Sequence, residues 1–146
     1  MDDHITTIYD TDFLDWTSTQ IELLRTKQFE RLDLENIIEE LKSMALAQRH
    51  ELEHRIERLT THLLKCKVQP WRISGSWLGT IREQRYRIAR LLEAMPSLQP
   101  LLDQYVITAY AHAAARAADE TRLPRAAFPA TVPFTKEQLL DPDYLP

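Results

Sequence analysis

Two histidines, His50 and His54, lie four residues apart in the segment His-Glu-Leu-Glu-His, which matches the H-E-x-x-H pattern. In that pattern two histidines on one helix face bind zinc and the glutamate activates a zinc-bound water. The helical phase opposes this chemistry. Leu52 belongs to the apolar stripe of the helix, and each histidine is rotated about 200° away from it. We therefore expect both histidines to point into solvent, among charged neighbours.

His62 and Cys66 are also one helical turn apart, a spacing that suits two metal ligands or a base with a nucleophile. Nucleophilic cysteines are favoured at helix N-termini, whereas Cys66 falls near a predicted C-terminus, where the helix dipole disfavours a thiolate. The positive charges of Lys65 and Lys67, in contrast, favour the thiolate. We interpret Cys66 as a half-buried small thiol.

Three glutamates, Glu35, Glu39 and Glu40, are similar in arrangement to the carboxylates of di-metal helix bundles. Those sites also need Glu-x-x-His pairs on facing helices, and the chain has none in phase with its predicted core. Acidic residues in the first turns of a helix are explained by the helix dipole. We therefore predict no catalytic residue, no metal ligand and no cofactor, and a protein that is not an enzyme.

Charge is unevenly distributed along the chain. Residues 65–90 contain seven basic residues and one acid, Glu83, whereas residues 1–64 contain seven basic and fourteen acidic residues. The basic segment also contains Trp71, Trp77 and Tyr86. Basic side chains interleaved with aromatic rings are typical of surfaces that hold phosphates and stack bases. This segment is where we expect a partner to bind.

The stretch Arg72–Ser76 precedes a predicted helix, whose free N–H groups favour an anion, and Arg82 follows more than one turn later. The residues that we predict to bind an anion or a partner are Lys65, Lys67, Trp71, Arg72, Ser74, Gly75, Ser76, Arg82 and Arg85. The alternative is neutralisation within the chain, with the basic helix packed on acidic ones and Arg85 paired with an acid of the second helix. The formal net charge of −4 favours neutralisation. The tryptophans then act as core and hinge anchors.

The composition indicates which kind of secondary structure contains these residues. Only 2 of the 146 residues are glycine, which argues against an all-β or α/β design, because tight turns draw on glycine. The single cysteine excludes an internal disulfide. We see no secretory signal and no apolar run long enough to span a membrane, so we expect a cytoplasmic protein with no membrane partner.

Apolar spacing predicts four main helices. The first begins near Asp10 or Thr11, either of which can cap it, and ends around Thr26–Gln28. The second is capped by Asp33 and runs to about Lys65, roughly 48 Å at 1.5 Å per residue. That length exceeds the width of a compact domain. Either the helix bends near Ser43–Gln48, or one end packs on another chain, so a homodimer is a hypothesis.

The remaining elements follow from prolines and caps. Pro70 ends the second helix, Ser74 or Ser76 caps a third from about Trp77 to Glu93, and Pro96 breaks that helix. Ser97 caps a fourth helix, rich in alanine. From Leu123 onward five prolines and several large apolar residues indicate an extended strap over the bundle. Within it Thr135 and Gln138 form a capping box for one short helical turn.

Four blocks of sequence resemble domain-of-unknown-function family 29, a bacterial family of small all-helical proteins. They read YDTDFLDWTSTQIELLR, LDLENIIEEL, HLLKCKVQPWRISGSWLGTIREQRYRIARLLEAMPSL and FPATVPFTKEQLLDPDYLP. The resemblance covers about residues 9–146. It implies a helical fold in a prokaryotic cytosol, and it implies no activity, cofactor or catalytic residue.

The sequence thus predicts an all-α, single-domain bundle over residues 1–146, with a core of about 10–122 and a proline-rich strap over 123–146. We expect a non-enzymatic interaction or regulatory module that acts through its helix faces on an unidentified protein partner or on a second copy of itself. The alternative is a nucleic-acid or anion binder that uses residues 65–90.

Overall fold

The computed structural model describes residues 7–146, and every regular element in that range is a helix. The all-α class expected from the sequence is therefore confirmed. By their contacts the residues form two compact units, one ending at Leu46 and the other beginning at Ala47. The expected single domain, with its core at about residues 10–122, stays a prediction. Within the described range, none of the helices has both the length and the hydropathy needed to cross a bilayer.

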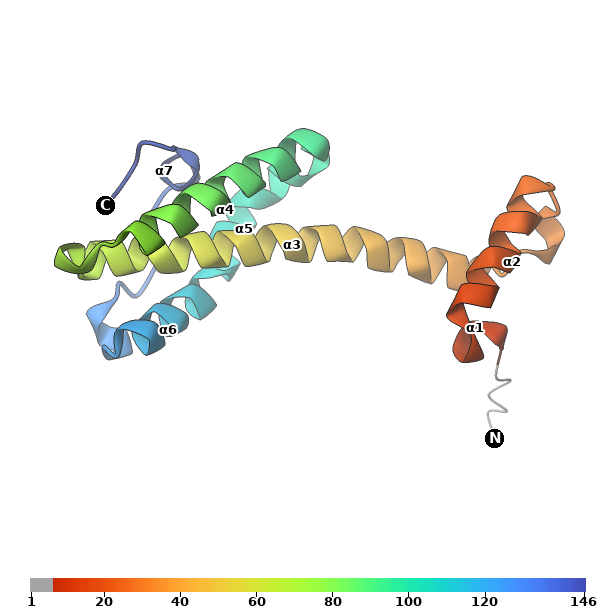
Figure 1. The fold of residues 1–146 in the computed structure, drawn as a ribbon, viewed down its shortest axis with the longest axis horizontal. Helices are drawn as coiled ribbons and strands as arrows, with labels where there is room; N and C mark the ends of the chain where they lie inside the picture. Colours follow the sequence, from red (N-terminus) through yellow and green to blue (C-terminus); the bar gives the residue numbers. More distant parts are fainter. Residues whose placement is uncertain (1–6) are drawn as a thin grey trace. The chain divides into compact units, whose positions relative to one another are not determined.

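The first unit contains two helices, a 3-10 turn and the beginning of a third helix (Figure 1): α1 (Ile8–Thr11), α2 (Phe13–Arg25), η1 (Phe29–Arg31) and the first turns of α3 (Leu34–Val68). The expected cap at Asp10 or Thr11 is wrong, because both residues belong to α1, which has its own capping box from Thr7 to Asp10. Asp12 caps α2 by accepting a hydrogen bond from the Asp15 N–H at 3.0 Å. The expected end near Thr26 is confirmed.

The helix α3 is continuous from Leu34 to Val68, 35 residues, and passes through Ser43–Gln48 without interruption. Its cap is Asp33, as expected: one carboxylate oxygen accepts from the Asn36 N–H at 3.4 Å. The other carboxylate oxygen accepts from the Trp16 indole N–H at 3.0 Å, which ties α2 to the start of α3. The end of the helix directly before Gln69 and Pro70 agrees with the proline signal.

In the second unit, η2 (Pro70–Arg72) connects α3 to α4 (Gly75–Ala94). Ser74, not Ser76, caps α4 by accepting from the Trp77 N–H at 3.2 Å. The C-terminal part of α3 and α4 lie side by side (Figure 1), and Arg55 of α3 donates to Gln84 of α4 at 3.2 Å.

The fourth predicted helix is wrong in detail, because Ser97 does not cap it. A 3-10 segment, η3 (Pro96–Leu101), comes first, and two short helices follow, α5 (Leu102–Thr108) and α6 (Tyr110–Thr121). Pro100 lies inside η3 and lacks the N–H that a Ser97 cap would accept from the third helical residue. The α-helix consequently begins only at Leu102.

The C-terminal segment contains η4 (Arg125–Ala127) and the five-residue helix α7 (Lys136–Leu140). The predicted capping box is confirmed, since Thr135 and Gln138 exchange both hydrogen bonds. Three large side chains of this segment, Phe128, Phe134 and Leu139, are buried in the core of the second unit. The segment is therefore part of the core of that unit.

The core of the second unit forms around the C-terminal part of α3. The side chains of Leu52, Ile56, Leu59 and Leu63 recur at three- and four-residue steps and are buried. Alanines of α6 allow a close approach of the two helices, and the Thr61 hydroxyl donates to the Ala113 carbonyl at 3.3 Å.

Candidate binding surfaces

Lys65, the first predicted site residue, is buried and paired. Its ammonium donates to Glu120 of α6 at 2.8 Å and lies 4.6 Å from the centre of the Trp77 ring. Glu120 is also 3.6 Å from Arg116. The charge of Lys65 is therefore neutralised inside the second unit, and its buried ammonium is not available to an external anion.

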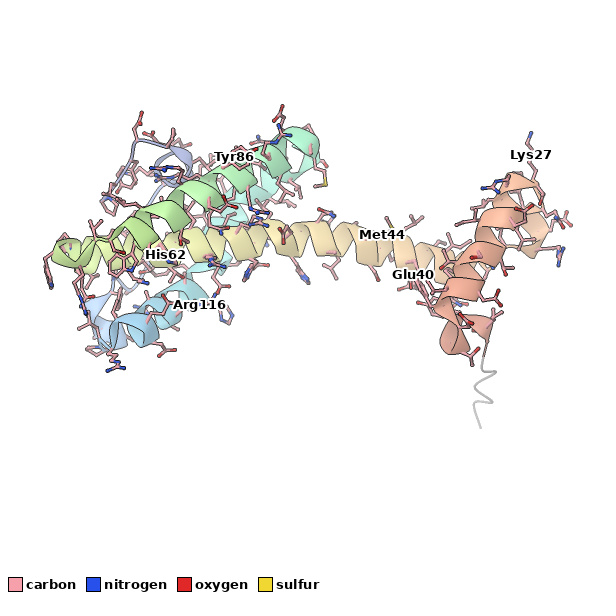
Figure 2. All side chains as sticks on the ribbon, viewed as in Figure 1. Lys27, Glu40, Met44, His62, Tyr86 and Arg116 are labelled. Atoms are coloured by element: carbon pink, nitrogen blue, oxygen red, sulfur yellow. The ribbon has the colours of Figure 1, made fainter. Side chains whose placement is uncertain are left out.

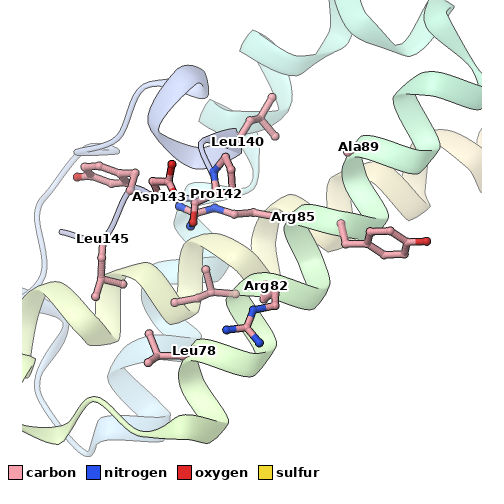
Figure 3. Close-up of a pocket in the computed structure, with 11 residues that line it drawn as sticks. Leu78, Arg82, Arg85, Ala89, Leu140, Pro142, Asp143 and Leu145 are labelled. Atoms are coloured by element: carbon pink, nitrogen blue, oxygen red, sulfur yellow. The ribbon is translucent and has the colours of Figure 1, made fainter.

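Arg85 is also buried, and its partners are backbone carbonyls (Figure 3). It donates to Leu139 at 2.8 Å, to Gln138 at 3.2 Å and to Pro142 at 3.5 Å. The expected pairing with an acid of the second helix is wrong, because the last carbonyls of the short helix α7 lack intrahelical partners and attract this guanidinium. Burial lowers the pKa of Arg85, and the nearby charge of Asp141 opposes that shift.

The other arginines of α4 divide into paired and unpaired groups. Arg87 pairs with Glu83, and Arg90 lies 3.3 Å from Glu93. A shallow hollow of about 530 Å³ beside them also contains Arg55, which pairs with Glu51. These charges are neutralised by pairs within one helix, and not by the expected packing of the basic helix on acidic ones. Four cations of the basic segment have no ion pair among the described residues: Lys67, Arg72, Arg82 and Arg85, the last of which is bonded to backbone carbonyls.

The predicted anion-binding stretch is on the surface. Arg72, Ser74, Gly75 and Ser76 are exposed, and the Ser74 hydroxyl is engaged as the cap of α4. Trp71 is 77% exposed, so its assignment as a core or hinge anchor is wrong. Burial of Trp16 and partial burial of Trp77 fit that assignment for the other two tryptophans.

The predicted site residues Arg82 and Arg85 meet at one pocket of about 580 Å³, between α4 and the C-terminal segment (Figure 3). Ile81 and Leu140 contribute apolar walls, and Tyr144 contributes an aromatic one. In Figure 3 the Arg85 side chain extends from α4 towards the turn at Pro142. Lys65, Trp71 and Ser74 are not part of this pocket, so the structure divides the predicted set.

The histidine and cysteine motifs behave as their helical phases indicate. His50 and His54 are exposed. Cys66 is fully buried rather than half-buried, and burial raises the pKa of its thiol. His62 is half-buried, and burial lowers its pKa. Among residues 7–146, no three histidine, cysteine or acidic side chains are grouped so as to hold a metal ion.

The first unit, whose side chains are drawn in Figure 2, exposes many large apolar residues, and the sequence did not predict their exposure. Its buried apolar side chains are Trp16 and Leu23. Its exposed large apolar side chains are Ile8, Phe13, Leu14, Ile21, Leu24, Phe29, Leu34, Ile38, Leu41, Met44 and Leu46. We call the α3 part of this set, Leu34, Ile38 and Leu41, the α3 apolar stripe. The spacing of these side chains by four and three residues was the available signal, but such spacing does not tell a covered stripe from an exposed one.

Comparison with known proteins identifies a family but indicates no activity. The model of one family, Domain of unknown function DUF29, matches residues 8–145. Neither a curated protein nor a solved structure matches the chain.

Proposed function

Because the chain belongs to the family described as Domain of unknown function DUF29, no chemistry comes with its membership, and we propose a function from the geometry. The protein is a non-enzymatic interaction module that self-associates through its first unit. The observation that carries this proposal is the open α3 apolar stripe. Leu34 and Leu41 are 58% and 59% exposed.

The size of the first unit supports the proposal. A helical unit of about 40 residues cannot bury enough apolar surface by itself, and oligomerisation is a common remedy. Here Tyr9, Phe13 and Trp16 form a small aromatic cluster, with ring centres 4.9–6.1 Å apart. The larger share of apolar side chains faces outwards. An exposed apolar surface of this extent is typical of a protein interface.

The direction of the stripe on α3 points to an external partner. Ile37 and Glu40 are half-buried, and Glu40 accepts a hydrogen bond from Tyr9 at 2.5 Å, so that side of the helix packs inside the unit. Leu34, Ile38 and Leu41 are spaced by four and three residues on a different side. A stripe with the same steps, from Leu52 onward, is buried where helices cover it.

Charge complementarity favours a second copy of the chain, in antiparallel orientation. Glu35 and Lys42 each follow a leucine of the stripe and are seven residues apart, so they lie on the same flank. In an antiparallel pair the same flanks meet. A two-fold axis near Ile38 then places Glu35 of each copy beside Lys42 of the other. The same axis places Leu34 of each copy against Leu41 of the other.

Lys42 can leave its present ion pair to contact Glu35 of the second copy. Its present partner is Glu39 at 3.0 Å, and both side chains are mostly exposed. Such a surface pair contributes about 0–1 kcal/mol, so it does not compete with an interfacial pair. A parallel arrangement would instead place Lys42 beside the flank of Ile37 and Met44, where the acid, Glu40, already accepts a hydrogen bond from Tyr9.

Sedimentation equilibrium of the full chain tests the proposal. We expect a dimer at micromolar concentration, and Leu41→Glu should weaken it about 100-fold, because a charge enters the apolar interface. Ile107→Glu, at an exposed position of α5, is the matched control and should leave the dimer unchanged. Circular dichroism shows whether each variant keeps its helices. A wild-type chain that stays monomeric at about 100 µM would rule the proposal out.

Charge reversal tests the orientation. Glu35→Lys and Lys42→Glu alone should each weaken the dimer, because each creates two like-charged contacts. The double variant should restore it, because both contacts are again complementary. Restoration is expected only when the partner is a second, antiparallel copy. Weakening without restoration would contradict that orientation.

The proposal also includes the architecture and the cellular setting that the sequence predicts. We propose a bundle of four main helices with residues 123–146 as a strap, and the burial of Phe128, Phe134 and Leu139 supports the strap. We also propose a bacterial, cytoplasmic setting. The lone, buried thiol of Cys66 is compatible with a reducing compartment.

A second candidate function is nucleic-acid or anion binding by residues 65–90. It is favoured by the exposed ring of Trp71 beside Arg72, and by Lys67, which has no ion pair among residues 7–146. A single-stranded oligonucleotide should then bind with an affinity that falls steeply with salt. Trp71→Ala should weaken that binding. Absence of binding at low salt would exclude this function.

A further inference from the structure

The pocket between α4 and the C-terminal segment has the dimensions of a small-molecule site. Its volume is about 580 Å³, within the range of about 300–1,000 Å³ typical of such sites. All of its lining residues belong to the second unit. It is therefore independent of the apolar surface on which the proposed function rests.

The lining of the pocket is mostly apolar. Ile81 and Leu78 come from α4, and Leu140, Pro142 and Leu145 come from the C-terminal segment (Figure 3). The rings of two tyrosines add aromatic surface. A ligand must therefore present an apolar body to gain free energy by entering.

The charged groups of the pocket favour an anion. Arg85 is buried in the wall, and its three hydrogen bonds go to neutral carbonyls, so no direct ion pair balances its charge. Arg82 is exposed at the pocket and has no ion pair or hydrogen bond to any described residue. The single acid among the lining residues is Asp143. Asp143 and the neighbouring Asp141 act on the charge of Arg85, which leaves the guanidinium of Arg82 as the unpaired cation of the pocket.

We propose that this pocket binds a small apolar carboxylate, an aliphatic chain that ends in a single negative charge. Its chain lies along Ile81 and Leu140, and its carboxylate pairs with the free guanidinium of Arg82. Arginine suits this role because its planar fork matches the two carboxylate oxygens.

Titration of the labelled full chain with decanoate, followed by amide NMR shifts, tests the proposal. For 12 non-hydrogen atoms we expect a dissociation constant of about 0.1 mM. Shifts should concentrate at Ile81, Ala89 and Leu140. Decanol, which has the same chain without the charge, should bind about fivefold more weakly.

Two variants test where the carboxylate and the aliphatic part of the ligand bind. Arg82→Gln should weaken decanoate about fivefold and leave decanol unchanged, whereas the matched control Arg87→Gln should change neither. Ala89→Phe fills the pocket without removing a contact and should abolish both shift patterns. Equal binding of decanol and decanoate, or shifts confined to the exposed apolar residues of the first unit, would overturn the proposal.

Discussion

The ammonium of Lys65 and the carboxylate of Glu120 meet 2.8 Å apart, and Lys65 has only 8% of its side chain exposed. The face of the Trp77 ring lies on the same ammonium, 4.6 Å from the ring centre. One basic residue of the segment 65–90 therefore joins three helices, α3, α4 and α6. Burial by itself would raise the pKa of Glu120, but the hydrogen bond and the charge of Lys65 lower it overall.

Removal of this acid should destabilise the second unit. Glu120→Gln leaves a buried ammonium with the Trp77 ring as its main partner, and we expect a loss of about 1–2 kcal/mol in the free energy of unfolding. The loss stays below that of a fully buried pair because Glu120 is 39% exposed. Glu93→Gln, whose pair with Arg90 is largely exposed, should cost less than about 0.5 kcal/mol. Urea denaturation measures both, and equal losses would contradict the prediction.

Arg85 should hold the C-terminal segment in place. In Arg85→Lys the ammonium cannot reach three carbonyls that are arranged for a planar guanidinium, and we expect a loss of about 2–3 kcal/mol. Hydrogen exchange of residues 134–144 should accelerate. Arg82→Lys, at an exposed neighbouring position, is the control and should leave the exchange rates unchanged. Unchanged exchange in Arg85→Lys would show that apolar packing alone fixes the segment.

His62 should make stability depend on pH. Burial lowers its pKa in the folded protein, with the charge of Lys65 in the same direction, against the opposing effects of the Arg58 carbonyl and Glu120. Below the unfolded pKa of about 6.5 the unfolded chain therefore binds more protons than the folded one. The free energy of unfolding should fall as pH decreases from about 7.5 to 5. His62→Gln should flatten that slope, and His54→Gln, at an exposed position, should retain it.

Helix boundaries were largely predictable because they depend on local signals. Asp33, Ser74 and Thr135 cap helices as their side chains indicate, and Pro70 and Pro96 follow helix ends. The errors have local causes too. The capping box of Thr7 and Asp10 begins the separate short helix α1, which contains the expected cap residues, and Pro100 lies in a 3-10 segment where an α-helix was expected.

The partners of charged side chains were not predictable in the same way. Lys65 and Arg85 were candidates for binding an external anion, with neutralisation inside the chain as the favoured alternative. Neither partner was identified: α6 supplies a carboxylate to Lys65, and the end of α7 supplies carbonyls to Arg85. Those groups are more than fifty residues away in sequence. No local pattern encodes such a meeting, because it depends on how the helices pack.

The sequence by itself determined the helical class, the main breaks and an apolar stripe along α3, since these follow from side-chain type and spacing within a few turns. Only the tertiary structure decided which part of the stripe is covered. From Leu52 onward helices bury it, while Leu34, Ile38 and Leu41 remain exposed. Both parts have the same three- and four-residue steps, so periodicity cannot distinguish them. The difference arises from which other segments pack against each part, and that is a property of the folded chain.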